Sequence, residues 1–443
     1  MELNLSIRNM GVIGAGGAGF PAHVKIENNC DIVIANGAEC EPLLCNDKYT
    51  IAEEADKVID GLESVMQFVK AKKGFVAVKK QYQTITSILE KVISSKKNIS
   101  LYLLDDFYPI GDEFLLVKEV AKKNIPPGGL PLDVGCLVNN VETLKNVSEA
   151  KSGVPVTEKA LTCTGELDNP AVVIAPIGMS IGNIIQLCKP KIKDFAVILG
   201  GPMMGTVVYN MDEPITKTTS GLIVLPRTHP IVISKSMKIE HIIRQSKSAC
   251  CQCTYCTELC PRYLLGHELY PHKIMRQINL GLDIPFEIIK NAFLCSECGL
   301  CEIFACPMGL SPRIINKEIK LRLTANGYKP YFEKENFSTR ENMFSRKIPT
   351  SSIKNRLRVS DYDDYNKHIK NILKPQAKIV EILLNQHIGK AAEAIVKKGD
   401  QVNKGDLIAD IPGDSFGARL HASITGEVIY LDELRIIIKK NEG

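Results

Sequence analysis

The sequence has no apolar run near the roughly 18 residues that a membrane-spanning helix requires, so no membrane span is expected. Its first residues, MELNLSIRN, lack the basic and apolar blocks of a secretory signal. The net charge of +5 is spread along the chain, and the basic groups at 70–73 and 79–80 are typical of solvated faces. These absences favour a cytoplasmic protein without a nucleic-acid partner.

The chain does contain much cysteine within an otherwise ordinary globular composition. Its 443 residues predict about two to four domains with large cores. Because no secretory signal is present, 15 cysteines favour metal ligands over disulfides. Eight of the 15 fall into two tight groups, and Cys30, Cys136, Cys163 and Cys188 are most simply small core residues.

The two groups are variants of one motif. ACCQCTYCTELCP contains C-x2-C-x2-C-x3-C-P, and LCSECGLCEIFACP contains C-x2-C-x2-C-x4-C-P. The first spacing is that of bacterial two-cluster ferredoxins, in which the fourth cysteine binds the other cluster. We therefore expect two [4Fe-4S] clusters. The expected ligands are Cys250, Cys253, Cys256 and Cys306 for one cluster, and Cys295, Cys298, Cys301 and Cys260 for the other.

Two structural zinc sites are the alternative interpretation of these cysteines. Zinc knuckles pair two cysteines from each of two separated loops, whereas here three cysteines recur at i, i+3 and i+6 before a terminal C-P. That repetition favours cubane clusters, and Cys251, which lies off the spacing, is interpreted as a spare thiol. Between the groups, residues 262–293 have helical spacing and predict an α-helical insertion.

A glycine-rich segment, GVIGAGGAGFP, lies at Gly11–Pro21 and contains G-x-G-x-x-G at Gly14, Gly16 and Gly19. A dinucleotide-binding Rossmann turn needs a preceding strand, a helix of several turns and an acid about twenty residues on. Here the preceding strand is short, Pro21 permits only a short helix, and the next strand, DIVIANG, begins twelve residues after Gly19. That distance is too short for an ordinary crossover helix.

Three further segments accompany the glycine loop: NGAECEP at 36–42, YPIGDE at 108–113 and NNVETL at 139–144. Strand ends that carry Asn, Glu and Gly are where open α/β sheets bind ligands. Each segment alone is better explained as a turn or a helix cap, and Asn140 is an obvious N-cap candidate. Only their combination indicates a binding site.

In this order the segments resemble the flavin-binding segments of the NADH-oxidising flavoprotein subunit of respiratory complex I and its superfamily. That superfamily includes the C component of the Rnf complex and the cobalamin reductases of propanediol-utilisation microcompartments. The resemblance spans about 11–147 and returns at both cysteine groups. It implies a multidomain α/β protein with a Rossmann-like domain that binds FMN, on whose exposed face NADH stacks.

Carried over by position, the resemblance implies a set of cofactor contacts. The glycines and Lys25 surround the FMN phosphate and ribityl chain, Phe20 is available to the nucleotide, Glu113 lies near the nicotinamide, and Glu39 and Glu41 fix nicotinamide or flavin geometry. The full set is Gly14, Gly16, Gly17, Gly19, Phe20, Lys25, Asn36, Glu39, Glu41, Glu113, Asn139, Asn140 and Thr143. No side chain is expected to act as an acid–base catalyst.

The sequence departs from the complex I pattern at three points. Ala15 stands where complex I has arginine, Ala38 stands where it has aspartate, and KIENN, after the loop, lacks the second aromatic residue. These losses weaken the expectation of NADH binding more than that of FMN binding.

The remaining segments complete a five-part prediction. After the FMN domain (1–150), residues 158–187 alternate apolar and small residues and 196–208 is a second strand-rich run. This region resembles the small β-grasp (SLBB) domain of the same superfamily and is expected at 151–235, with Gly200, Gly201 and Gly205 as turn glycines rather than a second phosphate loop. A helical dicluster domain (236–325), an extended connector (326–375) and an all-β domain (376–443) follow, and the last resembles the barrel-sandwich hybrid of biotinyl and lipoyl carriers. The hairpin HASITGEV lacks the lysine of biotinyl or lipoyl carriers, so a carrier role is not expected. The C-terminal position of this module favours the cobalamin reductases.

The resulting hypothesis is a reductase that passes electrons from NAD(P)H through FMN and two [4Fe-4S] clusters to cobalamin or a redox protein. It would work in the cytoplasm, including inside a microcompartment beside that compartment's enzymes. Two alternatives stay open: a non-catalytic electron-transfer subunit of an Rnf-type complex, and a structural metal-binding scaffold.

Overall fold

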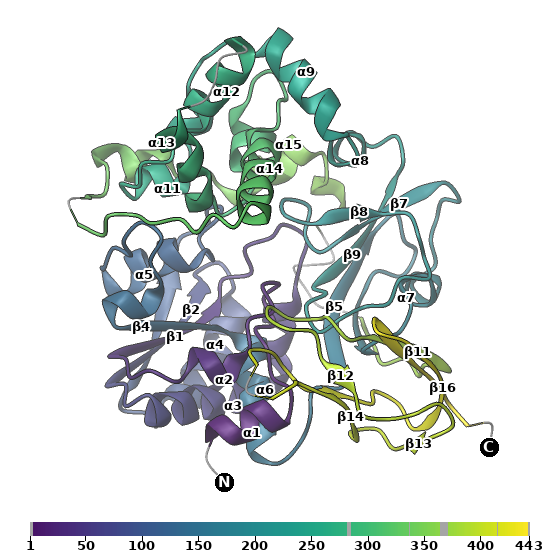
Figure 1. Cartoon of the computed structure of the whole chain (residues 1–443). Coiled ribbons are helices and arrows are strands. Elements are labelled where there is room, and N and C mark those ends of the chain that lie inside the picture. Colours follow the sequence, from purple (N-terminus) through teal and green to yellow (C-terminus); the bar gives the residue numbers. More distant parts are fainter. Residues whose placement is uncertain (1–2, 281–284, 336, 364–370, 414, 442–443) are drawn as a thin grey trace.

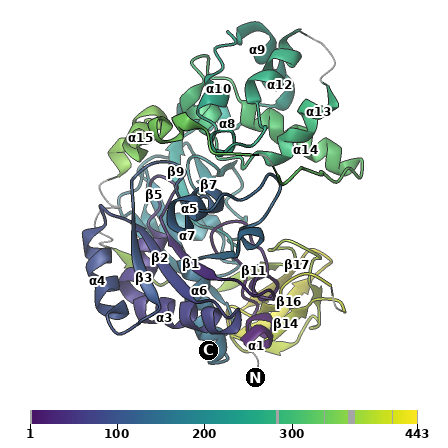
Figure 2. The same cartoon turned by 90° about the vertical axis from the view of Figure 1, so that its left-hand side faces the viewer.

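The computed structural model describes residues 3–280, 285–335, 337–363, 371–413 and 415–441. Figure 1 shows four folded parts: an N-terminal α/β part, a strand-rich second part, a helical part above them and a C-terminal β part. In the turned view of Figure 2 the helical part again lies at one end of the molecule, opposite the N-terminus. Within these ranges, no helix combines the length and apolarity needed to cross a bilayer.

The N-terminal part is built on a fully parallel sheet in the order β3-β2-β1-β4, which confirms the predicted parallel α/β fold. The strands are rich in Val and Ile because helices cover both faces. The long helix α3 (Asn46–Phe68) packs with α6 (Val141–Lys151) on one face, and α5 (Glu113–Ala121) covers the other. The other elements are α1 (Leu3–Asn9), α2 (Ala22–Lys25), β1 (Ile32–Gly37), β2 (Lys73–Lys79), α4 (Gln83–Ile93), β3 (Ile99–Leu104), η1 (Pro131–Val134) and β4 (Cys136–Asn140).

The second part is a six-stranded mixed sheet in the order β10-β6-β5-β9-β7-β8. The strands expected within 158–187 and 196–208 are confirmed as β5 (Glu158–Gly165), β6 (Ala171–Pro176), β7 (Phe195–Leu199) and β8 (Thr206–Val208), and β9 (Gly221–Pro226) lies beyond those two runs. The end of the alternating pattern, up to Leu187, is a helix instead, α7 (Ile181–Cys188). Ser180 caps it by accepting from the Asn183 amide, and its buried residues recur at helical spacing.

The helical part confirms the predicted insertion between the two cysteine groups. Its elements are α8 (Pro230–Lys235), α9 (Ile239–Ala249), α10 (Tyr255–Glu258), α11 (Pro261–Leu264), α12 (Pro271–Leu280), α13 (Phe286–Ile289), η2 (Lys290–Leu294), η3 (Cys301–Ala305) and α14 (Pro312–Ala325). The connector carries η4 (Glu341–Arg346), α15 (Thr350–Leu357), η5 (Ser360–Tyr362) and the edge strand β10 (Ile372–Leu373). Its residues 336 and 364–370 lie outside the described ranges.

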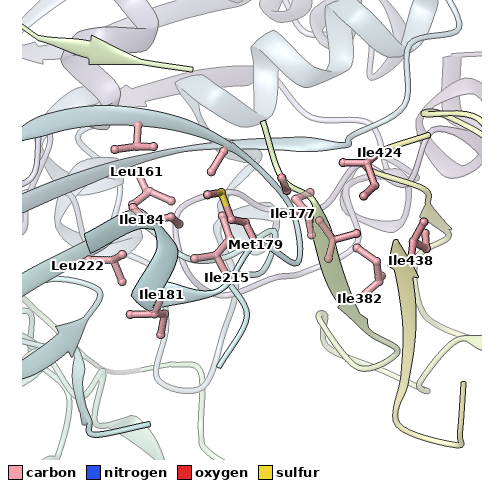
Figure 3. Packing of buried hydrophobic residues seen from close by; sticks show 14 of the residues in the cluster. Leu161, Ile177, Met179, Ile181, Ile184, Ile215, Leu222, Ile382, Ile424 and Ile438 are labelled. Atoms are coloured by element: carbon pink, nitrogen blue, oxygen red, sulfur yellow. The ribbon is translucent and has the colours of Figure 1, made fainter. Parts of the chain in front are cut away.

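The C-terminal part consists of two small antiparallel sheets, β11-β17-β16-β13 and β12-β14-β15, as the repeated short strands predicted. It shares one hydrophobic core with the second part, and Figure 3 shows Ile177 and Met179 packed near Ile382 and Ile424. The carrier hairpin is buried in this joint, because Ser423 is only 1% exposed and its hydroxyl donates to the Ile177 carbonyl at 2.6 Å. The strands are β11 (Ile379–Leu383), β12 (Glu393–Ala394), β13 (Gln401–Val402), β14 (Leu407–Asp410), β15 (Leu420–His421), β16 (Gly426–Leu431) and β17 (Arg435–Lys439).

Candidate functional site

The strand order places a binding crevice at the carboxyl ends of β1 and β4. The sheet order reverses between these strands, and open α/β sheets bind ligands at such switch points. Asn36 at the end of β1 lies opposite Asn140 at the end of β4 in the parallel register. The asparagines of NGAECEP and NNVETL, which are about a hundred residues apart in sequence, therefore meet at one edge.

The glycine loop closes over this edge. The Gly14 amide donates to the Phe20 carbonyl at 2.8 Å, and the Ala15 amide donates to the hydroxyl of Thr143 at 2.9 Å. A Cβ at Gly16 would lie 3.5 Å from the Cβ of Asn140, whereas one at Gly17, where φ is +107°, would meet nothing within 4 Å. The loop thus presents bare backbone to open space beside the switch point, which fits a phosphate group approached by amide N–H groups.

Below the loop, buried carboxylates are held by backbone amides. Glu39 has a positive φ of 42°, and its Oε2 accepts from the amides of Asp47 and Lys48 at 2.7 and 3.2 Å. Burial raises the pKa of Glu39, and burial together with the Glu39 charge raises the pKa of Asp47. Asn140 donates to Asp47 Oδ1 at 2.8 Å and caps α6 by accepting from the Glu142 amide, which confirms it as an N-cap.

Sequence reasoning missed several residues of this network, among them Asp47, Lys79, Asp106 and Lys159. Lys79 ends β2, is 1% exposed, pairs with Asp106 at 2.9 Å and donates to the Glu39 carbonyl at 3.3 Å. Lys79 is the last residue of β2, and Asp106 follows the neighbouring strand β3. The same strand-end rule that selected Asn36 could therefore have found both residues. Lys159 comes from β5 of the second part, pairs with Glu142 and donates to the Ala15 carbonyl at 3.1 Å, and no local motif announces it.

The other predicted cofactor residues differ in their partners. Lys25 and Glu113 are paired at 2.6 Å, so the residues expected at the phosphate and the nicotinamide contact each other. Asn36 donates to the Gly111 carbonyl at 2.9 Å. The Asn139 side chain is buried at the crevice, on β4.

Two predicted residues have partners outside the N-terminal part. The Phe20 ring packs edge-on against Phe416 of the C-terminal part, with centroids 5.2 Å apart. The Glu41 carboxylate accepts from the amides of Met203 and Met204, both at 2.8 Å. These amides belong to the β7–β8 turn that contains Gly200, Gly201 and Gly205, and Lys235 donates to its Gly205 carbonyl at 2.7 Å. The turn is therefore a docking point for Glu41.

The first predicted cysteine set surrounds a cavity. In the described part of the chain no three His, Cys, Asp or Glu side chains are close enough to hold one metal ion. A cavity of about 30 Å³ is instead lined by Cys250, Cys253, Cys256 and Cys306, together with Met275 and Leu310 among others. Burial, and then the neighbouring thiols with that of Cys306 foremost, raise the pKa of Cys256 to about 12. The far-separated Cys306 thus lies beside the first motif.

The cysteines of the second predicted set also lie close to one another. Burial raises the pKa of Cys260 to about 12, and the Cys295 thiol contributes to that rise. Burial also raises the pKa of Cys298, with Cys260 and Cys295 as the leading neighbouring thiols. The fourth cysteine of the first motif therefore lies among those of the second, as the two-cluster spacing predicts.

The two cysteine loops share one backbone conformation. Residues at the second and fourth positions after the first cysteine have positive φ in both: Gln252 (55°) and Thr254 (67°), then Glu297 (59°) and Gly299 (81°). This turns successive N–H groups inward, as in loops that surround anionic groups. The Glu297 amide lies 3.4 Å from the Cys295 sulfur. Thiols and inward amides together fit an iron–sulfur cluster, whose potential such contacts tune.

The second set adjoins the N-terminal part through the YPIGDE segment. Tyr108 is buried and donates to the Cys298 carbonyl. Two residues after Cys260, Arg262 makes a two-point ion pair with Asp112, at 2.5 and 3.0 Å, and stacks 3.7 Å from the Phe114 ring centroid. Two-point Arg–carboxylate pairs of this kind fix the relative orientation of the two side chains.

The comparisons with known families agree with these sites. Residues 7–149 match the Nuo51 FMN-binding domain, 249–311 match a 4Fe-4S dicluster domain, and 362–442 match the RnfC barrel sandwich hybrid domain. The chain therefore contains an FMN-binding domain, a 4Fe-4S dicluster domain and a barrel-sandwich hybrid.

Whole-chain relatives identify the family. The cobalamin reductase PduS of Salmonella typhimurium is 36% identical over 99% of this chain and 96% of its own length. The cobalamin reductase PduS of Citrobacter freundii is 37% identical over 98% and 95%. The C component of the Na(+)-translocating ferredoxin:NAD(+) oxidoreductase complex of Acetobacterium woodii is 35% identical, but over only 58% of this chain and 57% of its own. The chain belongs to the cobalamin reductase PduS family.

Proposed function

We propose that the chain is a reductase that transfers electrons from NADH or NADPH, through FMN and two [4Fe-4S] clusters, to cobalamin or a redox protein. The observation that carries the proposal is the continuity of the two sites. The segment 108–113 starts at the carboxyl edge of the FMN-binding sheet and ends in contact with the loop of Cys298 and with Arg262. Electron transfer between cofactors requires such a fixed, short connection.

The residues present fit FMN at the switch point. The bare backbone at Gly16 and Gly17 would meet its phosphate, and the Asn139 amide would bind a polar edge of the flavin. Lys48, Lys79 and Lys159 supply positive charge near the buried Glu39, Asp47 and Glu142. The chemistry that FMN supplies is the exchange of two-electron for one-electron transfer, which NAD(P)H and cubane clusters require between them.

We propose that the two cysteine sets act in a fixed order. The set Cys260, Cys295, Cys298 and Cys301 adjoins the FMN-binding part through Tyr108 and Asp112, so it would receive electrons first. The set Cys250, Cys253, Cys256 and Cys306 lines a cavity that also includes the exposed Cys251 and Met308, so it would deliver them to the acceptor. The protein contributes ligands, amide contacts and burial to both.

The proposed electron donor and acceptor are supported by the family to which the chain belongs. The complex I type of FMN domain supports NAD(P)H as donor, with Glu113, paired to Lys25, at the mouth of the site. The whole-length relatives are named cobalamin reductases, which supports cobalamin as acceptor. We place the chain in the cytoplasm or a microcompartment, and we retain boundaries at 150, 235, 325 and 375, with an SLBB-type β-grasp second domain.

An anaerobic titration with NADH tests the proposal. The purified chain should release FMN on acid treatment and contain about eight irons, which is two cubanes' worth. NADH should bleach the flavin absorbance and then give cluster EPR signals, and added cob(III)alamin should reoxidise both. A chain without flavin would refute the proposal, and zinc in place of iron would favour a structural scaffold.

A second candidate is a non-catalytic electron-transfer subunit. It is favoured by the 35% identity to the C component of a Na(+)-translocating complex over 265 residues. The same titration separates the two, because such a subunit would carry flavin and clusters that dithionite reduces but NADH does not.

A further inference from the structure

The C-terminal module has no assigned role, because its carrier hairpin lacks a lysine and is buried against the second domain. This module, residues 376–441, contacts the glycine loop directly. The Ile388 amide donates to the Gly19 carbonyl at 3.0 Å, and Phe416 packs against Phe20. Two backbone segments of the module, at 386–388 and 416–419, therefore lie against the loop.

Lys217 joins the three segments that meet there. It lies on the connection between β8 and β9, is buried, and donates through Nζ to the carbonyls of Gly11 at 2.7 Å and Arg419 at 2.8 Å. Its backbone amide donates to Gln386 Oε1 at 3.0 Å. One side chain of the second domain thus ties the start of the glycine segment to the C-terminal module.

The same packing explains two glycines that the sequence had linked to the cofactor motif. At Gly11, where φ is +64°, a Cβ would lie 2.3 Å from the Arg419 carbonyl oxygen and 2.7 Å from Lys217 Nζ. At Gly19, where φ is +68°, it would lie 3.1 Å from Thr218 and 3.4 Å from His387. Gly16 and Gly17 face Asn140 and open space instead. Gly11 and Gly19 therefore allow the C-terminal module to pack closely against the loop. Gly16 and Gly17 leave room for a ligand.

Further contacts, with the second domain and with the N-terminal part, also hold the C-terminal module in place. It shares a continuous hydrophobic core with the second domain (Figure 3), and Arg419 forks onto Asp410 at 2.8 and 2.9 Å while donating to Asn9 at 2.6 Å. Because these contacts hold the module in place, the module keeps the glycine loop in one conformation before the ligand binds. This lowers the entropy cost of ordering the loop on binding.

We propose that the C-terminal module is a fixed support for the FMN loop, and that Lys217 and Phe416 are positioning residues that hold the loop ready for the flavin phosphate. The proposal deepens the proposed function and rests on FMN binding at this loop. It gives the degenerate carrier module a role in cofactor retention in place of group carriage.

The test uses the full chain with its clusters, and first without flavin. Hydrogen exchange measured by mass spectrometry should accelerate about tenfold in the peptide covering 11–21 in both Lys217→Met and Phe416→Ala, because each loses about one to two contacts of ordinary strength. The matched control is Lys404→Met, which removes an ion pair between the same module and Glu158, away from the loop. Peptides covering β1 should be unchanged in all variants.

FMN is then added back, and its dissociation constant is measured by quenching of flavin fluorescence. Lys217→Met and Phe416→Ala should each weaken binding about tenfold and alter the visible circular dichroism of bound FMN. Lys404→Met should bind within twofold of the unaltered chain, and iron content should be the same throughout. Unchanged exchange at 11–21 in both variants, or equal acceleration in Lys404→Met, would overturn the support role. Accelerated exchange in a chain that binds no FMN would uphold the support role and overturn the proposed function.

Discussion

The phenol of Tyr108 donates a 2.5 Å hydrogen bond to the backbone carbonyl of Cys298. Tyr108 is buried, follows β3 of the FMN-binding sheet and lies in the hydrophobic cluster that also contacts Leu300. Together with the two-point Arg262–Asp112 ion pair, this bond fixes the second cysteine loop against the sheet whose edge forms the proposed flavin site. The spacing between the two redox sites therefore depends on side chains that belong to neither.

Replacing Tyr108 by Phe should loosen this joint. The Cys298 carbonyl would lose its buried donor, which costs about 1–3 kcal/mol when the group stays unsatisfied. We expect a lower thermal unfolding midpoint and slower reduction of the clusters after NADH is mixed with the chain, followed by stopped-flow absorbance.

Tyr102→Phe is the matched control, because the Tyr102 hydroxyl donates to the Glu119 carbonyl at 2.7 Å within the FMN-binding part. It should lose some stability and keep the electron-transfer rate. If both variants reduce their clusters at the unaltered rate, the Tyr108 contact has no part in coupling the sites.

Paired cysteine substitutions should reveal which thiols share a cluster. Cys260→Ser with Cys295→Ser removes two ligands of one proposed cluster, so about four irons and one EPR signal should remain. Cys260→Ser with Cys253→Ser damages both proposed clusters and should leave almost no iron. The reverse result, with iron kept in the second pair and lost in the first, would mean that each motif holds its own cluster.

Cys251→Ser provides the control for these substitutions. Cys251 is exposed and lies off the motif spacing, although it borders the same cavity. Its loss should leave the iron content at about eight atoms.

The sequence predicts the parts of this molecule that repeat a local rule. The cysteine motifs, the strand DIVIANG and the Asn140 cap are foreseeable because spacing, burial pattern and capping chemistry are encoded in neighbouring residues. The sequence favours a strand at helix α7 because AVVIAPIGMSIGNII alternates apolar and small residues beyond the end of β6. Only the Ser180 cap and the later helical spacing mark the change.

Local spacing, burial pattern and capping chemistry do not predict contacts between segments that are distant in the sequence. Lys159 reaches the Ala15 carbonyl from another domain, and Glu41 is bound by a turn some 160 residues away. The place of Phe20 in the loop favours a contact with the nucleotide, yet its partner Phe416 comes from the last domain. Each of these contacts is determined by how domains dock, which no local periodicity reports.

The buried Lys159–Glu142 pair should be a strong stabilising unit beneath the glycine loop. The two side chains are 3% and 9% exposed, so Lys159→Met would leave a buried carboxylate without its partner and cost about 3–5 kcal/mol. Adding Glu142→Gln to that variant should recover part of the loss, because no unpaired charge then remains. Thermal unfolding of the flavin-free chain measures both, and a double variant no more stable than the single would contradict this account.

The joint between the C-terminal module and the N-terminal part should weaken in acid. His23 on α2 and His421 on β15 are buried there. Burial, then Arg8 and His387, lowers the pKa of His23 to about 4, and burial, then Lys217 and Arg419, lowers that of His421 to about 3. Burial also lowers the pKa of His387, and it lowers that of Lys217 to about 7. Asp410, paired with Arg419, is the facing acid.

The sign of the effect follows from proton uptake on unfolding. An unfolded histidine has a pKa near 6.5, so between pH 6.5 and about 4 the unfolded chain binds more protons than the folded one. The stability that the histidines contribute is therefore complete above pH 6.5 and falls as the pH drops, by at most about 1.4 kcal/mol per pH unit for each histidine. The thermal unfolding midpoint should decrease as the pH is lowered from 7.5 to 5. The protection of the 11–21 peptide, relative to the intrinsic exchange rate at each pH, should decrease as well. His421→Gln should flatten this dependence, whereas the exposed His241→Gln should leave it unchanged; a pH profile that His421→Gln does not alter would place the acid-sensitive group elsewhere.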